Sequence, residues 1–136
     1  MNTPRPDVRM VPFKTTGIPF WVNRQQCRRI EVKVPGVFEN PGRAVGHIRR
    51  VVMTIHHGSG DIDGSYQGLM SPIPPGEHLL GSPTEGAVML FYTAIKSGWP
   101  DVAGCTVSFR TEVTGQNEPH VCSVVLTERG CVEQDQ

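Results

Sequence analysis

The sequence predicts an all-β protein, either a two-sheet antiparallel sandwich or a jelly-roll-like barrel. Several short segments alternate apolar and polar residues with the period of two that is typical of strands. Turns rich in glycine and proline separate these segments, and the 136-residue chain contains 15 Gly and 12 Pro. No segment has the 3.6-residue period of an amphipathic helix. The length fits one domain, so residues 1–136 are expected to form a single β domain.

About six strands are expected along the chain. The clearest is Cys105–Val113, which alternates without a fault. Its inward residues are Cys105, Val107, Phe109 and Val113. The other segments are Gly17–Asn23, Cys27–Val34, Gly46–His57, Ala87–Ile95 and Val121–Glu128. Ala87–Ile95 is apolar on both faces, which fits a central strand or a two-turn helix, and the strand is favoured.

Two irregularities are expected within this pattern. Ile48 is out of phase with Val51, which predicts a β-bulge near Arg49 and Arg50. Residues 35–42, with the sequence PGVFENPG, contain two Pro-Gly pairs and are expected to turn the chain.

Three segments lack a strand pattern altogether. Residues 1–16 are rich in proline and are expected to form an extended N-terminal arm. Residues 58–86, rich in glycine and proline, are expected to form one long irregular loop. Residues 129–136 are a polar, acidic tail. A loop of such length is commonly functional or in contact with a partner. Because all three have little apolar content, contacts with other protein are expected to hold them in place.

The charges are few and unevenly distributed. Charged residues make up 19% of the chain, below the roughly 25% of an average soluble domain, so either a partner covers part of the surface or uncharged polar loops replace the charges. Residues 1–50 contain ten Lys or Arg and three Asp or Glu, whereas residues 51–136 contain three and ten. The two halves either neutralise each other within one subunit or attract each other between subunits.

A nucleic-acid interface is a weaker alternative. Two arginine pairs, Arg28 with Arg29 and Arg49 with Arg50, could form a basic strand face, and the aromatic pair Phe20-Trp21 lies near the first. However, the net charge is zero and the pI is about 7.0, which argues against a dedicated nucleic-acid binder.

The four cysteines are not spaced as metal ligands, and no pair forms a CxxC motif. They are Cys27, Cys105, Cys122 and Cys131. The first residues lack a signal-peptide layout, and no apolar run is long enough for a membrane span. We therefore expect reduced thiols and a protein that is cytoplasmic where it is made, with no membrane association and no cofactor.

One cluster of residues has side chains that could bind a metal ion and catalyse a reaction. His56 and His57 end an expected strand, and Asp61 and Asp63 follow in a glycine-rich stretch, so a metal-dependent hydrolase is one hypothesis. Adjacent residues of a strand point to opposite faces, which makes joint ligation by both histidines difficult. No GxSxG, HExxH or P-loop motif is present, and the other three histidines are expected to have no chemical role.

The favoured interpretation is a non-enzymatic structural or assembly protein that forms homo-oligomers or joins a larger assembly. Its most concrete form is a minor structural component of a virus or phage particle, such as a capsid-cementing or decoration protein, located in the virion after assembly. Aromatic side chains and an extended arm are typical anchors on a neighbouring subunit, although the arm could equally cross its own domain. The candidate interface residues are Arg5, Arg9, Phe13, Phe20 and Trp21. The alternative is a ligand-binding or inhibitory module that uses the long loop.

Overall fold

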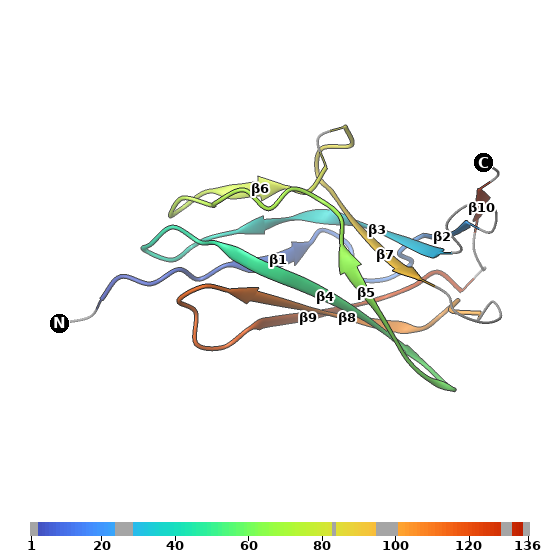
Figure 1. The fold of residues 1–136 in the computed structure, drawn as a ribbon. Coiled ribbons are helices and arrows are strands. Elements are labelled where there is room, and N and C mark those ends of the chain that lie inside the picture. The colour runs from blue at the N-terminus through green and yellow to red at the C-terminus, as the bar shows by residue number, and fades with distance from the viewer. Residues whose placement is uncertain (1–2, 24–28, 83, 95–100, 129–131, 135–136) are drawn as a thin grey trace.

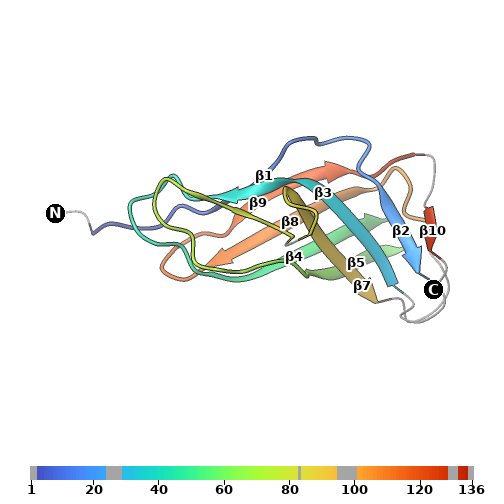
Figure 2. The ribbon, with the colours of Figure 1, turned by 90° about the horizontal axis from the view of Figure 1, so that it is seen from above.

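The computed structural model describes residues 3–23, 29–82, 84–94, 101–128 and 132–134. In this part of the chain every regular element is a strand, and all strand pairs are antiparallel except that of β10 with β2. The strands form one strongly curved sheet that almost closes into a barrel (Figures 1 and 2). The predicted all-β class is confirmed, and no helix that could span a membrane occurs among the described residues.

Strand order follows the hydrogen-bonded path β10-β2-β3-β7-β5-β4-β8-β9, and both β1 and β6 pair with β3 outside this path. The strands are β1 (Arg9–Pro12), β2 (Phe20–Asn23), β3 (Arg29–Glu39), β4 (Ile48–His57), β5 (Gly60–Tyr66), β6 (His78–Leu80), β7 (Val88–Ala94), β8 (Thr106–Val113), β9 (His120–Val125) and β10 (Val132–Gln134). Strands β2, β4, β7, β8 and β9 correspond to segments that the sequence predicts to be strands. Ala87–Ile95 is therefore a strand rather than a helix, and the bulge predicted near Arg49 is confirmed by a register shift between Ile48 and Arg50.

Strand β3 is longer than predicted. The prediction of a turn at Pro35-Gly36 is therefore wrong. The strand passes through this pair, and its neighbours change there: residues up to Pro35 pair with β7, whereas Gly36 to Glu39 pair with β1. A Cβ atom at Gly36 would overlap the carbonyl oxygen of Val11 and lie 2.7 Å from Met89 Cε. The glycine is therefore needed for close packing rather than for a turn.

The stretch 58–86 is also more regular than predicted, because it contains β5 and β6. Strand β5 pairs with β4 and, through Ser65 and Tyr66, with β7. Gly64 is close to the backbone of β7, where a Cβ atom would lie 2.6 Å from the Tyr92 carbonyl oxygen. Within the described part of this stretch, irregular structure is thus confined mainly to residues 67–77, 81–82 and 84–87.

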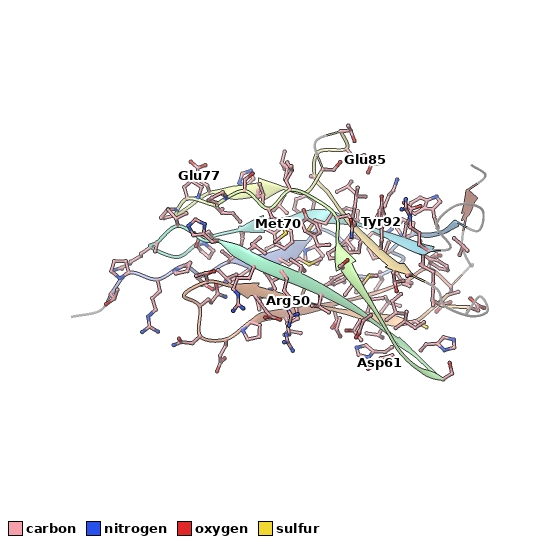
Figure 3. The ribbon with its side chains drawn as sticks, viewed as in Figure 1. Arg50, Asp61, Met70, Glu77, Glu85 and Tyr92 are labelled. Atoms are coloured by element: carbon pink, nitrogen blue, oxygen red, sulfur yellow. The ribbon has the colours of Figure 1, made fainter. Side chains whose placement is uncertain are left out.

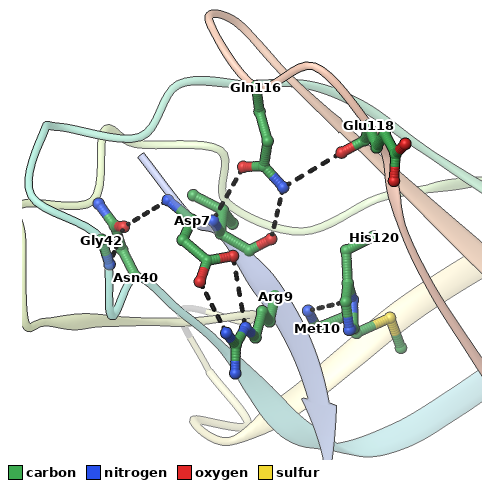
Figure 4. A network of polar contacts seen from close by, with 9 residues as sticks. Asp7, Arg9, Met10, Asn40, Gly42, Gln116, Glu118 and His120 are labelled. Carbon is green, nitrogen blue, oxygen red and sulfur yellow. Dashed lines mark hydrogen bonds and ion pairs between the residues drawn. The ribbon is translucent and has the colours of Figure 1, made fainter. Parts of the chain in front are cut away.

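The N-terminal arm crosses its own domain. This is one of the two paths expected from the sequence, the other being an anchor on a neighbouring subunit. Strand β1 pairs with β3, and the side chains of Val8 and Met10 are buried in the core. On its other edge, β1 faces β9, and side chains supply the bonds that a backbone ladder would otherwise provide. Gln116 Oε1 accepts from the Val8 N–H at 2.9 Å, and Gln116 Nε2 donates to the Val8 carbonyl at 3.3 Å (Figure 4). These bonds help to close the barrel.

Side chains fill the interior of the barrel. Tyr66, Phe91, Phe38 and Phe109 form a continuous aromatic cluster, in which the Phe91 and Phe109 ring centroids are 4.5 Å apart. Met53 and other fully buried residues from both halves of the chain pack around these rings. A barrel filled in this way holds its shape by packing and leaves its outer faces as the places where function can reside.

Candidate functional site

The β4–β5 hairpin carries the four residues of the metal hypothesis. His56 lies directly opposite Asp61 in the ladder, on the exposed outer face. His57 lies at the end of the strand, where its Nδ1 is 2.8 Å from Ser59 Oγ. Asp63 accepts a hydrogen bond of 2.9 Å from the Thr54 hydroxyl. Within the described residues, no group of three His, Cys, Asp or Glu side chains could hold a metal ion.

The same face instead contains a relay of polar contacts across β5, β4, β8 and β9. His56 Nδ1 is 3.1 Å from Asp61 Oδ1, and His56 Nε2 is 2.8 Å from Ser108 Oγ. Ser108 Oγ is in turn 3.3 Å from Ser123 Oγ. We call Asp61, His56 and Ser108, with Ser123 beside them, the polar relay.

Chemistry assigns the protons in the polar relay. An ionised carboxylate only accepts hydrogen bonds, so Nδ1 of His56 carries the proton that is donated to Asp61. The Nε2 atom of the neutral ring is then an acceptor, and the Ser108 hydroxyl donates to it. This is the order of roles in a serine–histidine–carboxylate arrangement, in which the carboxylate fixes the tautomer of the base.

The polar relay was missed by sequence reasoning for a physical reason. The sequence places His56 and Asp61 in one candidate metal cluster with His57 and Asp63, but Ser108 lies 52 positions away from His56. The β4–β8 register, in which Thr54 pairs with Ser108 and His56 with Thr106, brings the serine next to the histidine. No local motif encodes that register.

The five predicted interface residues lie in different environments. Phe20 is 2% exposed and belongs to the core, so its side chain is not available to a partner. Trp21 is half-buried, with Lys33 Nζ 4.7 Å from its ring centroid. Arg5 and Arg9 are exposed, and Arg9 pairs with Asp7 at 2.7 Å. Phe13 is 62% exposed.

Phe13 belongs to an apolar surface that the sequence did not reveal. Val11, Val37 and Leu80 form a cross-strand row on the outer side of β1, β3 and β6. Phe13 follows two residues after Val11, and its N–H donates to the Pro35 carbonyl at 2.7 Å, continuing the pairing of β1 with β3. We define the apolar face as the exposed Phe13 and Leu80 and the partly exposed Val11, with Val37, which is only 9% exposed, between them and with the neighbouring Leu69 and Met70. The Leu69 N–H donates to the Gly81 carbonyl at 2.9 Å, which places this pair beside the end of β6, and Met70 is labelled in Figure 3.

The opposed charges of the two halves meet within the subunit. Arg50 Nε is 2.9 Å from Glu112 Oε2, and Lys33 Nζ is 3.0 Å from Glu85 Oε1. The Arg50 and Arg110 guanidinium groups hold the pKa of Glu112 below its ordinary value. Of the alternatives left open by the sequence, these contacts favour neutralisation within one subunit over attraction between subunits.

Two arginines of the nucleic-acid alternative, Arg29 and Arg50, have partners in the chain. The Arg29 guanidinium lies 3.9 Å from the Tyr92 ring centroid, and Arg29 Nη2 is 3.6 Å from Glu31 Oε1. Arg49 lines a surface hollow of about 160 Å³ together with Glu112 and Arg110. Arg28 lies outside the described residues, as do Cys27 and Cys131, whereas Cys105 and Cys122 are free thiols.

The fold is that of a small, mainly antiparallel all-β protein with a filled, barrel-like core. The polar relay and the apolar face both lie on its outer surface. No family model matches the sequence, and a search of curated proteins finds no match either.

Proposed function

We propose that this protein has a structural or assembly function, in which it acts non-enzymatically through protein–protein contacts made by the apolar face. One observation carries the proposal. Among the described residues six large hydrophobic side chains are exposed, and four of these, Phe13, Leu69, Met70 and Leu80, belong to the apolar face. The remaining two are Val45 and Val121.

Clustered exposure of this kind favours a binding surface because burial of apolar area drives association, at about 25 cal/mol per Å² removed from water. Phe13, at 62% exposed, and Leu80, at 43% exposed, have the largest exposed fractions among these four residues. The filled interior disfavours the alternative of a module that encloses a small ligand. An inhibitory module that binds another protein would use the same face.

The most concrete form of the proposal is a minor structural component of a virus or phage particle, of the cementing or decoration type. The protein would be made in the cytoplasm and act in the particle, as a homo-oligomer or bound to a larger protein lattice. The all-β fold and the low charged fraction of 19% support this form, because an extensive contact surface has few ionised groups at its centre. Because Arg50 and Lys33 of the basic half already pair with Glu112 and Glu85 of the acidic half inside the subunit, apolar contacts rather than opposite charges would set the affinity.

The oligomeric state in solution tests the proposal. Light scattering coupled to size exclusion is expected to show a species heavier than 15.0 kDa for the natural chain. The double variant Phe13→Ser with Leu80→Ser should shift this species to the monomer. The matched control is Val45→Ser with Val121→Ser, which removes exposed apolar groups outside the apolar face and should leave the oligomer intact. A natural chain that is monomeric at every concentration and fails to co-migrate with particles would overturn the proposal.

A further inference from the structure

The polar relay has a chemical consequence that the assembly function does not use. We propose that Ser108 is an activated nucleophile that accepts acyl groups from activated esters, with His56 as its general base and Asp61 as the residue that positions the base. This inference is independent of the apolar face.

Geometry is the first support. The base and the nucleophile are 2.8 Å apart, and the base and its positioning carboxylate are 3.1 Å apart, both within the range expected of working partners. Each of the three side chains is on a different strand, and β4 is hydrogen-bonded to both β5 and β8. The ladders therefore hold the constellation in place without a ligand.

Access is the second support. The side chains of His56 and Asp61 are 44% and 60% exposed, and they lie at the tip of the hairpin (Figure 3 labels Asp61). An ester in solution can reach Ser108 from the open face. Water can reach it as well, so an acyl group on Ser108 can be removed by hydrolysis.

In the proposed step, Ser108 Oγ attacks the carbonyl carbon of the ester and forms an Oγ–C bond. The hydroxyl proton passes to His56 Nε2, and the bond between the carbonyl carbon and the leaving oxygen breaks with its electron pair. His56 then releases the proton to the leaving group or to solvent. Hydrolysis of the acyl-serine by water returns the hydroxyl and yields a carboxylic acid.

The surroundings of Ser108 limit which esters can react. Ser108 pairs with Thr54 on one side and with Ser123 on the other, so the backbone N–H groups around it belong to sheet ladders rather than to an oxyanion hole. One oxyanion donor is worth on the order of 10²–10³ in rate, and that assistance is missing here. The substrate class is therefore small esters with a stabilised leaving group, such as phenyl esters with electron-withdrawing substituents.

The hairpin contains a built-in comparison for the experiment. Ser59 Oγ is 2.8 Å from His57 Nδ1, but no carboxylate contact to His57 is recorded among the described residues. The full chain is treated with p-nitrophenyl acetate, and acetylated serines are quantified by peptide mass spectrometry. Both serines have an imidazole within hydrogen-bond distance, but the described contacts give only His56 a carboxylate that fixes its tautomer, so acetylation of Ser108 should be at least about tenfold faster than that of Ser59.

Variants separate chemistry from structure. His56→Gln keeps a polar side chain but removes the base, so Ser108 should fall to the rate of Ser59 or below it and lose the rise in rate with pH that an imidazole base imparts. Asp61→Asn should slow Ser108 at every pH, because an amide no longer imposes the reactive tautomer. His57→Ala is the control and should leave Ser108 unchanged. The inference is overturned if Ser108 reacts no faster than Ser59, or if folded His56→Gln, checked by circular dichroism, reacts like the natural chain.

Discussion

The Met10 N–H donates a hydrogen bond to Nδ1 of His120 over 3.2 Å, which connects the N-terminal strand to the edge strand on the other side of the barrel seam. The imidazole must be neutral at Nδ1 to accept this bond. His120 lies opposite Thr111 on the half-buried inner side of β9, and Figure 4 shows its contact with Met10. The seam between β1 and β9 therefore depends on a side chain that can change its protonation near neutral pH.

We expect acid to weaken this seam. Burial lowers the pKa of His120, Arg9 lowers it further, and Asp7 opposes them. A lowered pKa in the folded state means that the stability contribution is complete above the unfolded-state pKa, about 6.5 for histidine, and is lost as pH falls through the folded-state pKa. Denaturant unfolding should show a free energy of unfolding that decreases below about pH 6.5, by roughly the 1 kcal/mol typical of one hydrogen bond.

His120→Asn provides the comparison for that pH dependence, because the amide oxygen can accept the Met10 N–H but does not titrate. Its free energy of unfolding should vary less between pH 7 and pH 5 than that of the natural chain. His78→Asn, on exposed β6, is the matched control and should keep the natural pH dependence. Equal pH slopes for His120→Asn and the natural chain would show that the seam does not sense pH.

A second prediction concerns two glycines that the sequence alone does not distinguish. Gly36→Ala should destabilise the protein by roughly 1–3 kcal/mol, because the new methyl group overlaps the backbone of β1 at Val11. Gly58→Ala should be neutral or slightly stabilising, since nothing lies within 4 Å of the added Cβ atom. Thermal unfolding of both variants measures the difference, and equal midpoints would contradict the packing at Gly36.

Packing between strands, which decides the effect of a glycine, also explains why the sequence predicts some strands and misses others. Strand β8 could be predicted because its inward residues, such as Val107 and Phe109, are large and apolar, and their period of two is visible in the sequence. Strand β5 has charged Asp61 and Asp63 on its outer face and Gly64 on the inner one, so its alternation gives almost no hydrophobic signal. Its partners β4 and β7 supply the burial that makes it a strand.

The candidate sites could be predicted only in part, for a related reason. His56 and Asp61 are near each other in the chain, and a hairpin makes them neighbours. The contact with Ser108 and the row of Val37 with Leu80 depend on strand register between distant segments. Register is set by the complete fold, and period-two patterns do not encode which strands pair.

The third prediction is slow alkylation of Cys122. Burial raises the pKa of its thiol to about 11, so little of the reactive thiolate is present in the folded protein near pH 8. Iodoacetamide should therefore modify Cys122 much more slowly in the native chain than in urea. Peptide mass spectrometry with Cys105 as the internal comparison, whose thiol is also half-buried, measures the rate. Equal rates for Cys122 in the native and unfolded chains would contradict its inward position on β9.

The fourth prediction concerns Asn40, a fully buried amide that connects three loops by its hydrogen bonds. Its Oδ1 accepts from the N–H groups of Asp7 and Gly42, both at 3.0 Å. Its Nδ2 donates to the carbonyl oxygens of Ala44, at 2.7 Å, and Ile73, at 2.9 Å. All four hydrogen-bonding positions of the amide are used (Figure 4 shows the two acceptor bonds).

Asn40→Ala should destabilise the protein by roughly 2–4 kcal/mol, because it leaves one buried and three part-buried backbone groups without their partner. Asn40→Asp should also be destabilising, since a carboxylate cannot donate to the two carbonyl oxygens and carries a buried charge. The exposed Asn117→Ala is the control and should change the free energy of unfolding by less than about 0.5 kcal/mol. If denaturant unfolding gave Asn40→Ala the stability of Asn117→Ala, the amide would not hold the N-terminal segment against the loops after β3 and before β6. The apolar face, which depends on the position of β1, would then need another anchor.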